Sequence, residues 1–209
     1  MSNVEKRARG RPAGSADQGP KRQEFVAAVM RSLAENGYKD LTVATISEAG
    51  GFSRGLIAHY FPSKNALLLH AVEQVAKDFE EATRAAVAAA GPDPLDRLHA
   101  VVVASFRPPV FTPERVLVWV ALVSTSRWSP ELAGVYRKLY RPYRRALAHL
   151  IKRAAVARGA KLDAGRLAMT LTQLVEGWWS GWAADPDNIS PAKGEAACHE
   201  LLDAFFRAR

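Results

Sequence analysis

The run Gly51-Phe52-Ser53-Arg54-Gly55 has the spacing Gly-x-Ser-x-Gly. In esterases this spacing forms a sharp turn between a buried strand and a helix, and the turn exposes the serine as a nucleophile. Here the preceding residues, 42–49, have a polar, helix-like pattern, and the rest of the sequence shows no alternating strands for a parallel sheet. The sequence therefore predicts that Ser53 is not a nucleophile and that the protein is not an enzyme.

The histidines, carboxylates and cysteine offer no other reactive site. The sequence has no paired carboxylates and no phosphate-binding loop, and its one cysteine, Cys198, cannot form an internal disulfide. The five histidines, which show no metal-ligand spacing, are His59, His70, His99, His149 and His199. We expect no catalytic residue, no metal and no cofactor.

Length and apolar patterning favour a cytoplasmic protein. The longest uninterrupted apolar stretch, residues 116–123, is far shorter than the roughly 20 residues of a membrane-spanning helix. The N-terminus is basic and lacks the apolar segment of a secretory signal. With 209 residues, of which 48% are apolar, the chain can form one sizeable domain or two modest ones.

The net charge of +8 is concentrated in two zones. Residues 1–64 carry +4 and residues 132–162 carry +9, whereas the rest carries −5. The first zone begins with residues 1–20, whose glycines and prolines predict a segment that is disordered on its own. Within it, Arg9-Gly10-Arg11-Pro12 resembles the core of an AT-hook, in which extended arginines enter the DNA minor groove. A merely solubilising tail is the alternative.

From residue 21 onward the apolar periodicity is helical, so we expect an all-α fold. A helix is predicted over residues 21–36, two short helices over 42–50 and 53–59, and a long helix over 63–90. Thr42 and Ser53 are the expected N-caps. Two short helices joined by a glycine turn, after a longer helix, are the layout of a helix-turn-helix, whose second short helix enters the DNA major groove.

The residues around this turn resemble the DNA-binding domain of the tetracycline-repressor (TetR) family of bacterial regulators. The resemblance rests on Gly37-Tyr38, Thr42, Ile46 and the run Gly50-Gly51-Phe52-Ser53-Arg54-Gly55-Leu56-Ile57-Ala58-His59-Tyr60-Phe61-Pro62-Ser63-Lys64. Gly50 departs from the alanine that is usual in the family, and we expect it to loosen the turn without abolishing it. The resemblance implies a regulator that binds double-stranded DNA.

Side chains in this segment have chemistry suited to DNA. Arg54 carries the planar fork that reads guanine O6 and N7, and Ile57 is expected to contact a thymine methyl group. Leu56 and Phe61 are expected in the core. The other candidates allow close approach to the bases or resemble the family's phosphate contacts. The predicted DNA-binding set is Arg9, Arg11, Thr42, Ser53, Arg54, Gly55, Ile57, Ala58, His59, Tyr60 and Lys64.

The second basic zone lies on a predicted helix over residues 130–158, in a chain of nine or ten helices. Sorting its residues at 100° intervals places the basic side chains opposite the apolar ones. We interpret the basic side as a solvated face, with a membrane-surface role as the lesser alternative. Pro142 should kink this helix without altering the sorting.

Aromatic residues are concentrated between residues 119 and 182, a range that contains all five tryptophans. Buried aromatic rings around a pocket can bind a quaternary ammonium by cation–π attraction. The segment from Trp119 to Tyr143, together with Leu174-Val175-Glu176-Gly177-Trp178, is similar to the choline-sensing BetI branch of the TetR family. The predicted ligand-binding residues, with Glu176 supplying counter-charge, are Phe106, Trp119, Trp128, Tyr140, Tyr143, Glu176 and Trp179.

Small residues on the helix over 163–184 suggest close helix packing. The family resemblance implies dimerisation through the last two long helices, and the predicted interface residues are Leu150, Gly177, Trp178 and Gly181. Packing within one chain is the alternative.

Together these features predict three parts: a flexible basic tail over 1–20, a helix-turn-helix domain over 21–66, and an effector-binding and dimerisation domain over 67–209. We expect a homodimeric repressor of a palindromic operator that is released by a small molecule such as choline or another quaternary ammonium. One alternative is a ligand-independent architectural DNA binder with a filled core. Another is a repressor of an efflux or catabolic operon with an apolar effector.

Overall fold

The computed structural model describes residues 18–206, and its regular structure in that range is entirely α-helical. The helices are α1 (Gln18–Asn36), α2 (Val43–Gly50), α3 (Arg54–Tyr60), α4 (Lys64–Ala89), α5 (Pro94–Phe106), α6 (Pro113–Ser126), α7 (Pro130–Arg158), α8 (Ala164–Ala184) and α9 (Pro191–Phe206). The predicted all-α fold is therefore confirmed. No helix in residues 18–206 combines the length and the apolar character that a bilayer crossing requires.

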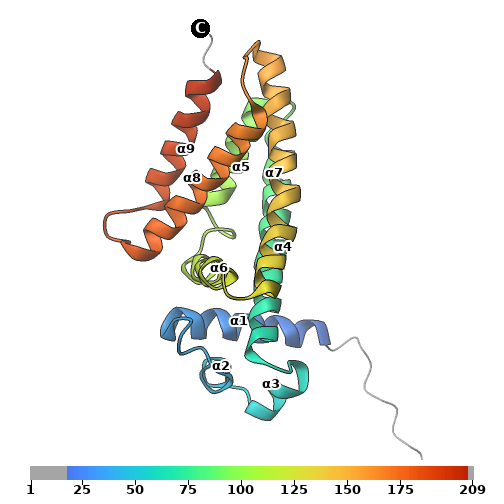
Figure 1. Cartoon of the computed structure of the whole chain (residues 1–209), viewed down its shortest axis with the longest axis vertical. Helices are drawn as coiled ribbons and strands as arrows, with labels where there is room; N and C mark the ends of the chain where they lie inside the picture. Colours follow the sequence, from blue (N-terminus) through green and yellow to red (C-terminus); the bar gives the residue numbers. More distant parts are fainter. Residues whose placement is uncertain (1–17, 207–209) are drawn as a thin grey trace, which may run out of the picture.

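The molecule is elongated, with α1–α3 at one end and α5, α8 and α9 toward the other (Figure 1). The long helices α4 and α7 run along the length between them, and α6 lies across the middle, close to α1 (Figure 1). Because α4 follows α3 directly and reaches the distal helices, it is a continuous connection between the two ends.

The boundaries of the short helices follow the caps that the sequence predicts. The hydroxyl of Thr42 accepts a hydrogen bond from the backbone N–H of Thr45 at 3.1 Å, and that of Ser53 accepts one from Leu56 at 3.2 Å. Gly51 ends α2 with φ 67°, a left-handed conformation that glycine adopts without steric cost. These local signals fix the turn between α2 and α3.

Two apolar clusters form the core. The first contains Phe25, Ile46 and Leu67 and joins α1–α3 to the start of α4, then continues into α6 and α7 through Val118 and Leu132. The second lies among α5–α9. The predicted domain boundary between residues 66 and 67 thus falls inside α4, whose first turns belong to the first cluster.

The basic zone of α7 is sorted largely as predicted. The buried side contains Leu132, Val135, Leu147 and Ile151, and the exposed side contains Arg137, Lys138, Arg141, Arg145 and Lys152. Pro142 lies inside α7, which continues past it to Arg158. Arg144 is the exception, because it is half-buried with its guanidinium 5.6 Å from the centre of the Tyr140 ring.

Two half-buried histidines make the stability of the fold depend on pH. The pKa values of His70 and His199 are lowered, mainly because burial penalises the charged imidazolium, with further contributions from Arg22 at His70 and from His99 at His199. His199 on α9 faces His99 on α5, with their Nδ1 atoms 2.6 Å apart. The carboxylates of Glu195 and Asp203 raise the pKa of His199 but do not outweigh its burial.

We expect the free energy of unfolding to fall as the pH drops below about 6.5, the ordinary pKa of histidine. Between that value and the lowered pKa of the folded state, the unfolded chain takes up a proton that the folded chain does not, so acid favours unfolding. Urea unfolding across this range measures the slope. His199→Gln should flatten it relative to His149→Gln, which removes an exposed histidine. An equal slope in both variants would contradict the assignment.

Candidate functional site

The turn between α2 and α3 lies at the end of the molecule opposite α9 (Figure 1). Arg54 is the first residue of α3, and its side chain is exposed. Gly55 and Ala58 on the same short helix are also exposed, and a Cβ built on Gly55 would meet no other atom within 4 Å. This combination of a guanidinium and small residues allows close approach of a large partner.

The flanking candidates surround this surface. Thr42 and His59 are exposed, and Ser53 is exposed while its hydroxyl caps α3. Tyr60 is half-buried, with its ring 5.1 Å from that of Phe25 in α1. Lys64 begins α4. Arg9 and Arg11 lie outside the described residues.

The prediction for Ile57 is wrong. Its side chain is 1% exposed and belongs to the first apolar cluster with Phe25 and Leu67, so it cannot reach a base. Leu56, predicted in the core, is only partly buried, whereas Phe61 is buried as expected. The physical reason is that the side of α3 that carries Ile57 packs against α1 and the start of α4.

The absence of a side chain at Gly50 leaves space for the Phe52 ring. A Cβ at this position would lie 2.4 Å from carbons of the Phe52 ring and 2.8 Å from the Cβ of Ala28 in α1. The Phe52 ring in turn packs edge-on against Phe25 at 4.8 Å. The glycine therefore has a packing reason: it allows a large aromatic side chain at the turn.

We expect Gly50→Ala to lower the free energy of unfolding by about 1–3 kcal/mol, the usual cost of overpacking. Because the closest clash is with the Phe52 ring, adding Phe52→Val should recover part of that loss, and the contact with Ala28 accounts for the remainder. A double-mutant cycle from urea unfolding measures the coupling. If the two substitutions were simply additive, the two side chains would not compete for the same space.

A second feature is a cavity of about 620 Å³ in the distal part of the molecule. Residues of α4, α5, α6 and α7 form its wall, together with Trp179 of α8 and Val110. Its size suits a small-molecule ligand, for which pockets of about 300–1,000 Å³ are usual. The architectural alternative predicted a filled core, so this cavity argues against it.

One end of the cavity is aromatic. Trp119 packs edge-on against Trp179 with ring centres 5.6 Å apart, and its Nε1 donates a hydrogen bond to the Tyr140 hydroxyl at 2.7 Å. Phe79 of α4 lies 5.3 Å from the Tyr143 ring. Burial raises the pKa of both tyrosines above the ordinary value. These rings are therefore neutral at physiological pH and offer π faces to a cation.

Glu176 lies behind the aromatic wall and does not line the cavity. Tyr136 donates a hydrogen bond from its hydroxyl to Glu176 at 3.1 Å, and its ring stacks on Tyr140 at 4.3 Å. The carboxylate nevertheless raises the pKa of Tyr140, after burial. It can therefore act on a ligand through its field but not by direct contact.

Four of the seven predicted ligand residues line the cavity: Trp119, Tyr140, Tyr143 and Trp179. Trp128 does not, because it follows α6 at the surface and is 82% exposed. Phe106 is buried beside Phe111 and α9, outside the wall. The predictions for Trp128 and Phe106 are therefore wrong. Both depended on aromatic residue type and ignored which side of the chain each ring occupies.

Sequence reasoning missed the charged part of the wall. It contains four cations from three helices, Arg84, Arg97, Lys138 and Arg153, and among the described residues one carboxylate, Glu80. Glu80 forms an ion pair with Arg84. Arg84, Lys138 and Arg153 are exposed, so helical sorting could identify them as polar but could not show that they border the cavity.

The predicted interface residues have different surroundings. Gly177 of α8 is exposed, and a Cβ there would meet nothing within 4 Å. Gly181 instead packs against Ile189, where a Cβ would lie 2.9 Å from Cδ1, and a Cβ on Gly194 of α9 would lie 2.9 Å from the Trp178 ring. Leu150 is half-buried and lines the cavity. Close packing within the chain thus accounts for two of these positions.

Two sequence families match the chain. Residues 25–71 match the bacterial regulatory proteins of the tetR family, and residues 94–207 match the BetI-type transcriptional repressor C-terminal domain. The HTH-type transcriptional regulator BetI of Stenotrophomonas maltophilia (strain R551-3) is 33% identical over 90% of this chain and 94% of its own length.

Solved structures share the fold. A transcriptional regulator from Pseudomonas aeruginosa PAO1 has a TM-score of 0.77 at 25% identity and covers 91% of this chain and 92% of its own. A transcriptional regulator from Saccharomonospora viridis, solved in complex with choline, has a TM-score of 0.81 at 21% identity and covers 91% of this chain and 99% of its own.

Proposed function

The chain belongs to the TetR family of bacterial transcriptional regulators and has the C-terminal domain of the BetI-type repressors, and on this premise we propose that it is a dimeric repressor released from a palindromic operator by a small molecule in the cavity. The observation that carries the proposal is that α4 connects the helix-turn-helix core to the cavity. Its first turn packs in the helix-turn-helix core through Leu67, and its later turns line the cavity through Val75 and Phe79.

On the DNA side, Arg54 reads a guanine in the major groove, while Ser53, Gly55 and Ala58 lie against the base edges. The proposed phosphate contacts are Thr42, His59, Tyr60 and Lys64, with Arg9 and Arg11 in the adjacent minor groove. Two copies of α3 in a dimer reach successive major grooves, about 34 Å apart. The positive charge of residues 1–64 supports such an interface.

On the effector side, the aromatic end of the cavity favours a quaternary ammonium group. The rings of Trp119, Trp179 and Tyr143 line this end and present buried π faces, and the field of Glu176 adds to their attraction for a cation. The choline complex of the Saccharomonospora viridis regulator supports this class of ligand for the shared fold.

A ligand can release DNA only if it binds the two states of the dimer with different affinity. We propose that a ligand between α4 and α7 shifts α4, which carries α1–α3 with it and changes the distance between the two recognition helices. The free protein then fits the operator, and the liganded protein does not.

The dimer interface is proposed on the outer faces of α8 and α9. Gly177 and the exposed Met169 lie on α8, and the exposed Phe205 lies on α9. Large apolar side chains at the surface commonly mark association sites. Residues 1–20, 21–66 and 67–209 are the proposed tail, DNA-binding and effector-binding parts of a cytoplasmic protein without catalytic activity.

Footprinting on the promoter beside the protein's own gene tests the proposal. We expect one protected, nearly symmetric site with two half-sites a helical turn apart. Its affinity should fall steeply between about 50 and 200 mM salt, because phosphate contacts release counterions. Protection that is spread evenly along the fragment would instead indicate sequence-independent binding.

A further inference from the structure

The cavity has a basic end that the proposed ammonium ligand does not explain. Arg84 of α4, Arg97 of α5 and Arg153 of α7 all line it. The ion pair with Glu80 compensates Arg84. Within the wall formed by the described residues, no second carboxylate is present for the other two guanidinium groups.

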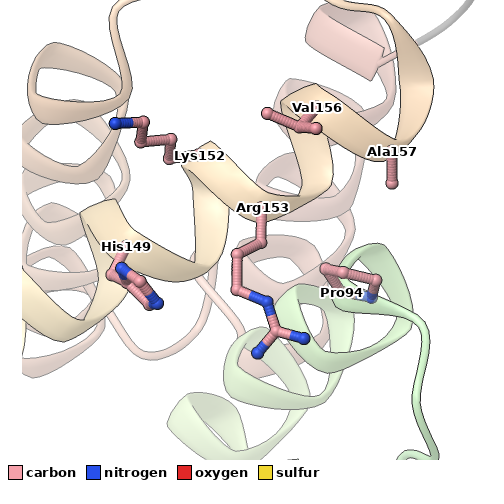
Figure 2. Close-up of a pocket in the computed structure, with 6 residues that line it drawn as sticks. All are labelled: Pro94, His149, Lys152, Arg153, Val156 and Ala157. Carbon is pink, nitrogen blue, oxygen red and sulfur yellow. The ribbon is translucent and has the colours of Figure 1, made fainter.

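A local contact positions Arg97 in the part of the cavity that it shares with Arg84 and Arg153. The Nε of Arg97 donates a hydrogen bond to the carbonyl oxygen of Gly91 at 2.6 Å, which anchors the side chain. Arg153 also lines a second pocket, shared with Pro94 of α5, in which its side chain extends from α7 toward α5 while Lys152 points away (Figure 2). Nearby Asp93 is engaged by Arg158 at 2.9 Å and caps α5 through the Leu95 N–H.

An apolar passage separates the basic end from the aromatic end. Tyr143 and Arg153 are ten residues apart on α7, which corresponds to about 15 Å along the helix. Between Tyr143 and Arg153, the α7 side of the wall is apolar through Leu147 and Leu150, and Val101 of α5 faces it, whereas the α4 side also contains Glu80, Thr83 and Arg84. The cavity therefore combines π faces, an apolar passage and uncompensated positive charge.

We propose that the effector carries an anionic oxygen group, a carboxylate or a phosphate, which binds Arg97 and Arg153 and is joined by an apolar chain to the group held at the aromatic end. The inference rests on the proposed function, because it concerns the same cavity. Guanidinium groups bind such anions through paired, charge-assisted hydrogen bonds. Choline has neither the length nor the negative charge to occupy both ends.

Three octyl compounds test this inference by calorimetry and by release of operator DNA: octyltrimethylammonium, octanoate, and ω-trimethylammonio-octanoate, which carries both groups. We expect the last to bind most tightly. Arg153→Gln should weaken its binding by about tenfold, the usual effect of losing a charge-assisted hydrogen bond, and should not weaken that of octyltrimethylammonium. Arg145→Gln is the matched control, because Arg145 is exposed on the same helix outside the cavity wall.

The outcomes separate the inference from the proposed function. If octyltrimethylammonium bound and released DNA as well as the doubly charged compound, and Arg153→Gln changed neither, the inference would be overturned while the proposed function stood. Binding of octanoate that depends on Arg153, without binding of octyltrimethylammonium, would support the acidic group and contradict the ammonium ligand. If no compound bound, both would fail.

Discussion

Arg54→Ala is expected to remove specific recognition of the operator. A bidentate arginine–guanine contact contributes about 1–3 kcal/mol of discrimination, and a dimer on a palindrome loses two of them. The combined loss of about 2–6 kcal/mol corresponds to roughly 30-fold to 20,000-fold weaker specific binding. Because Arg54 is exposed at the first position of α3, the substitution should leave the fold intact.

Fluorescence anisotropy with the operator and with a scrambled duplex measures this effect. Arg145→Ala, which removes the same charge from the exposed face of α7, should leave both affinities nearly unchanged. Arg54→Lys keeps the charge but loses the planar fork, so it should retain non-specific binding and lose specificity. Equal loss of affinity for both duplexes in Arg54→Ala would assign Arg54 to the phosphates instead of the bases.

Tyr140→Leu is expected to abolish most of the response to a quaternary ammonium while operator binding persists. Tyr140 lines the cavity and accepts the Trp119 hydrogen bond. Loss of this ring and of the hydroxyl that holds the Trp119 ring should cost about 2 kcal/mol of cation–π attraction, which raises the concentration of octyltrimethylammonium needed to release DNA by roughly 30-fold. Titration of the protein–operator complex with this compound measures the shift.

Trp128→Leu is the matched control for this prediction. It also replaces an aromatic residue by leucine, but Trp128 is at the surface and outside the cavity wall. Its titration curve should match that of the unmodified protein. If the Trp128 variant lost the response and the Tyr140 variant kept it, the ligand would bind elsewhere.

Local chemistry accounts for what could be predicted from the sequence. Thr42 and Ser53 are N-caps and Gly51 is a left-handed C-cap, because each acts through contacts with residues only a few positions away. The helix-turn-helix and its exposed arginine could therefore be placed without knowledge of the rest of the chain. The same reasoning holds for the basic face of α7, which follows from helical periodicity alone.

Features that depend on packing between distant segments could not be predicted in this way. Ile57 and Leu56 are adjacent apolar residues, and only the position of α1 and α4 decides that Ile57 is the more buried. The aromatic residue type of Trp128 gave no indication that it lies outside the core. Arg97 and Arg153 are far apart in the sequence, and their common cavity depends on how α5 packs against α7.

The most direct test of the account is the thermodynamic coupling between the cavity and the DNA-binding face. Operator affinity should be measured with and without saturating ω-trimethylammonio-octanoate, and the affinity for this compound with and without saturating operator. Thermodynamic linkage requires that the compound weakens operator binding by the same factor by which the operator weakens binding of the compound. We expect this factor to be about 5- to 150-fold. Two ratios of one, with both compounds bound, would show that the cavity does not control DNA binding and would contradict the account.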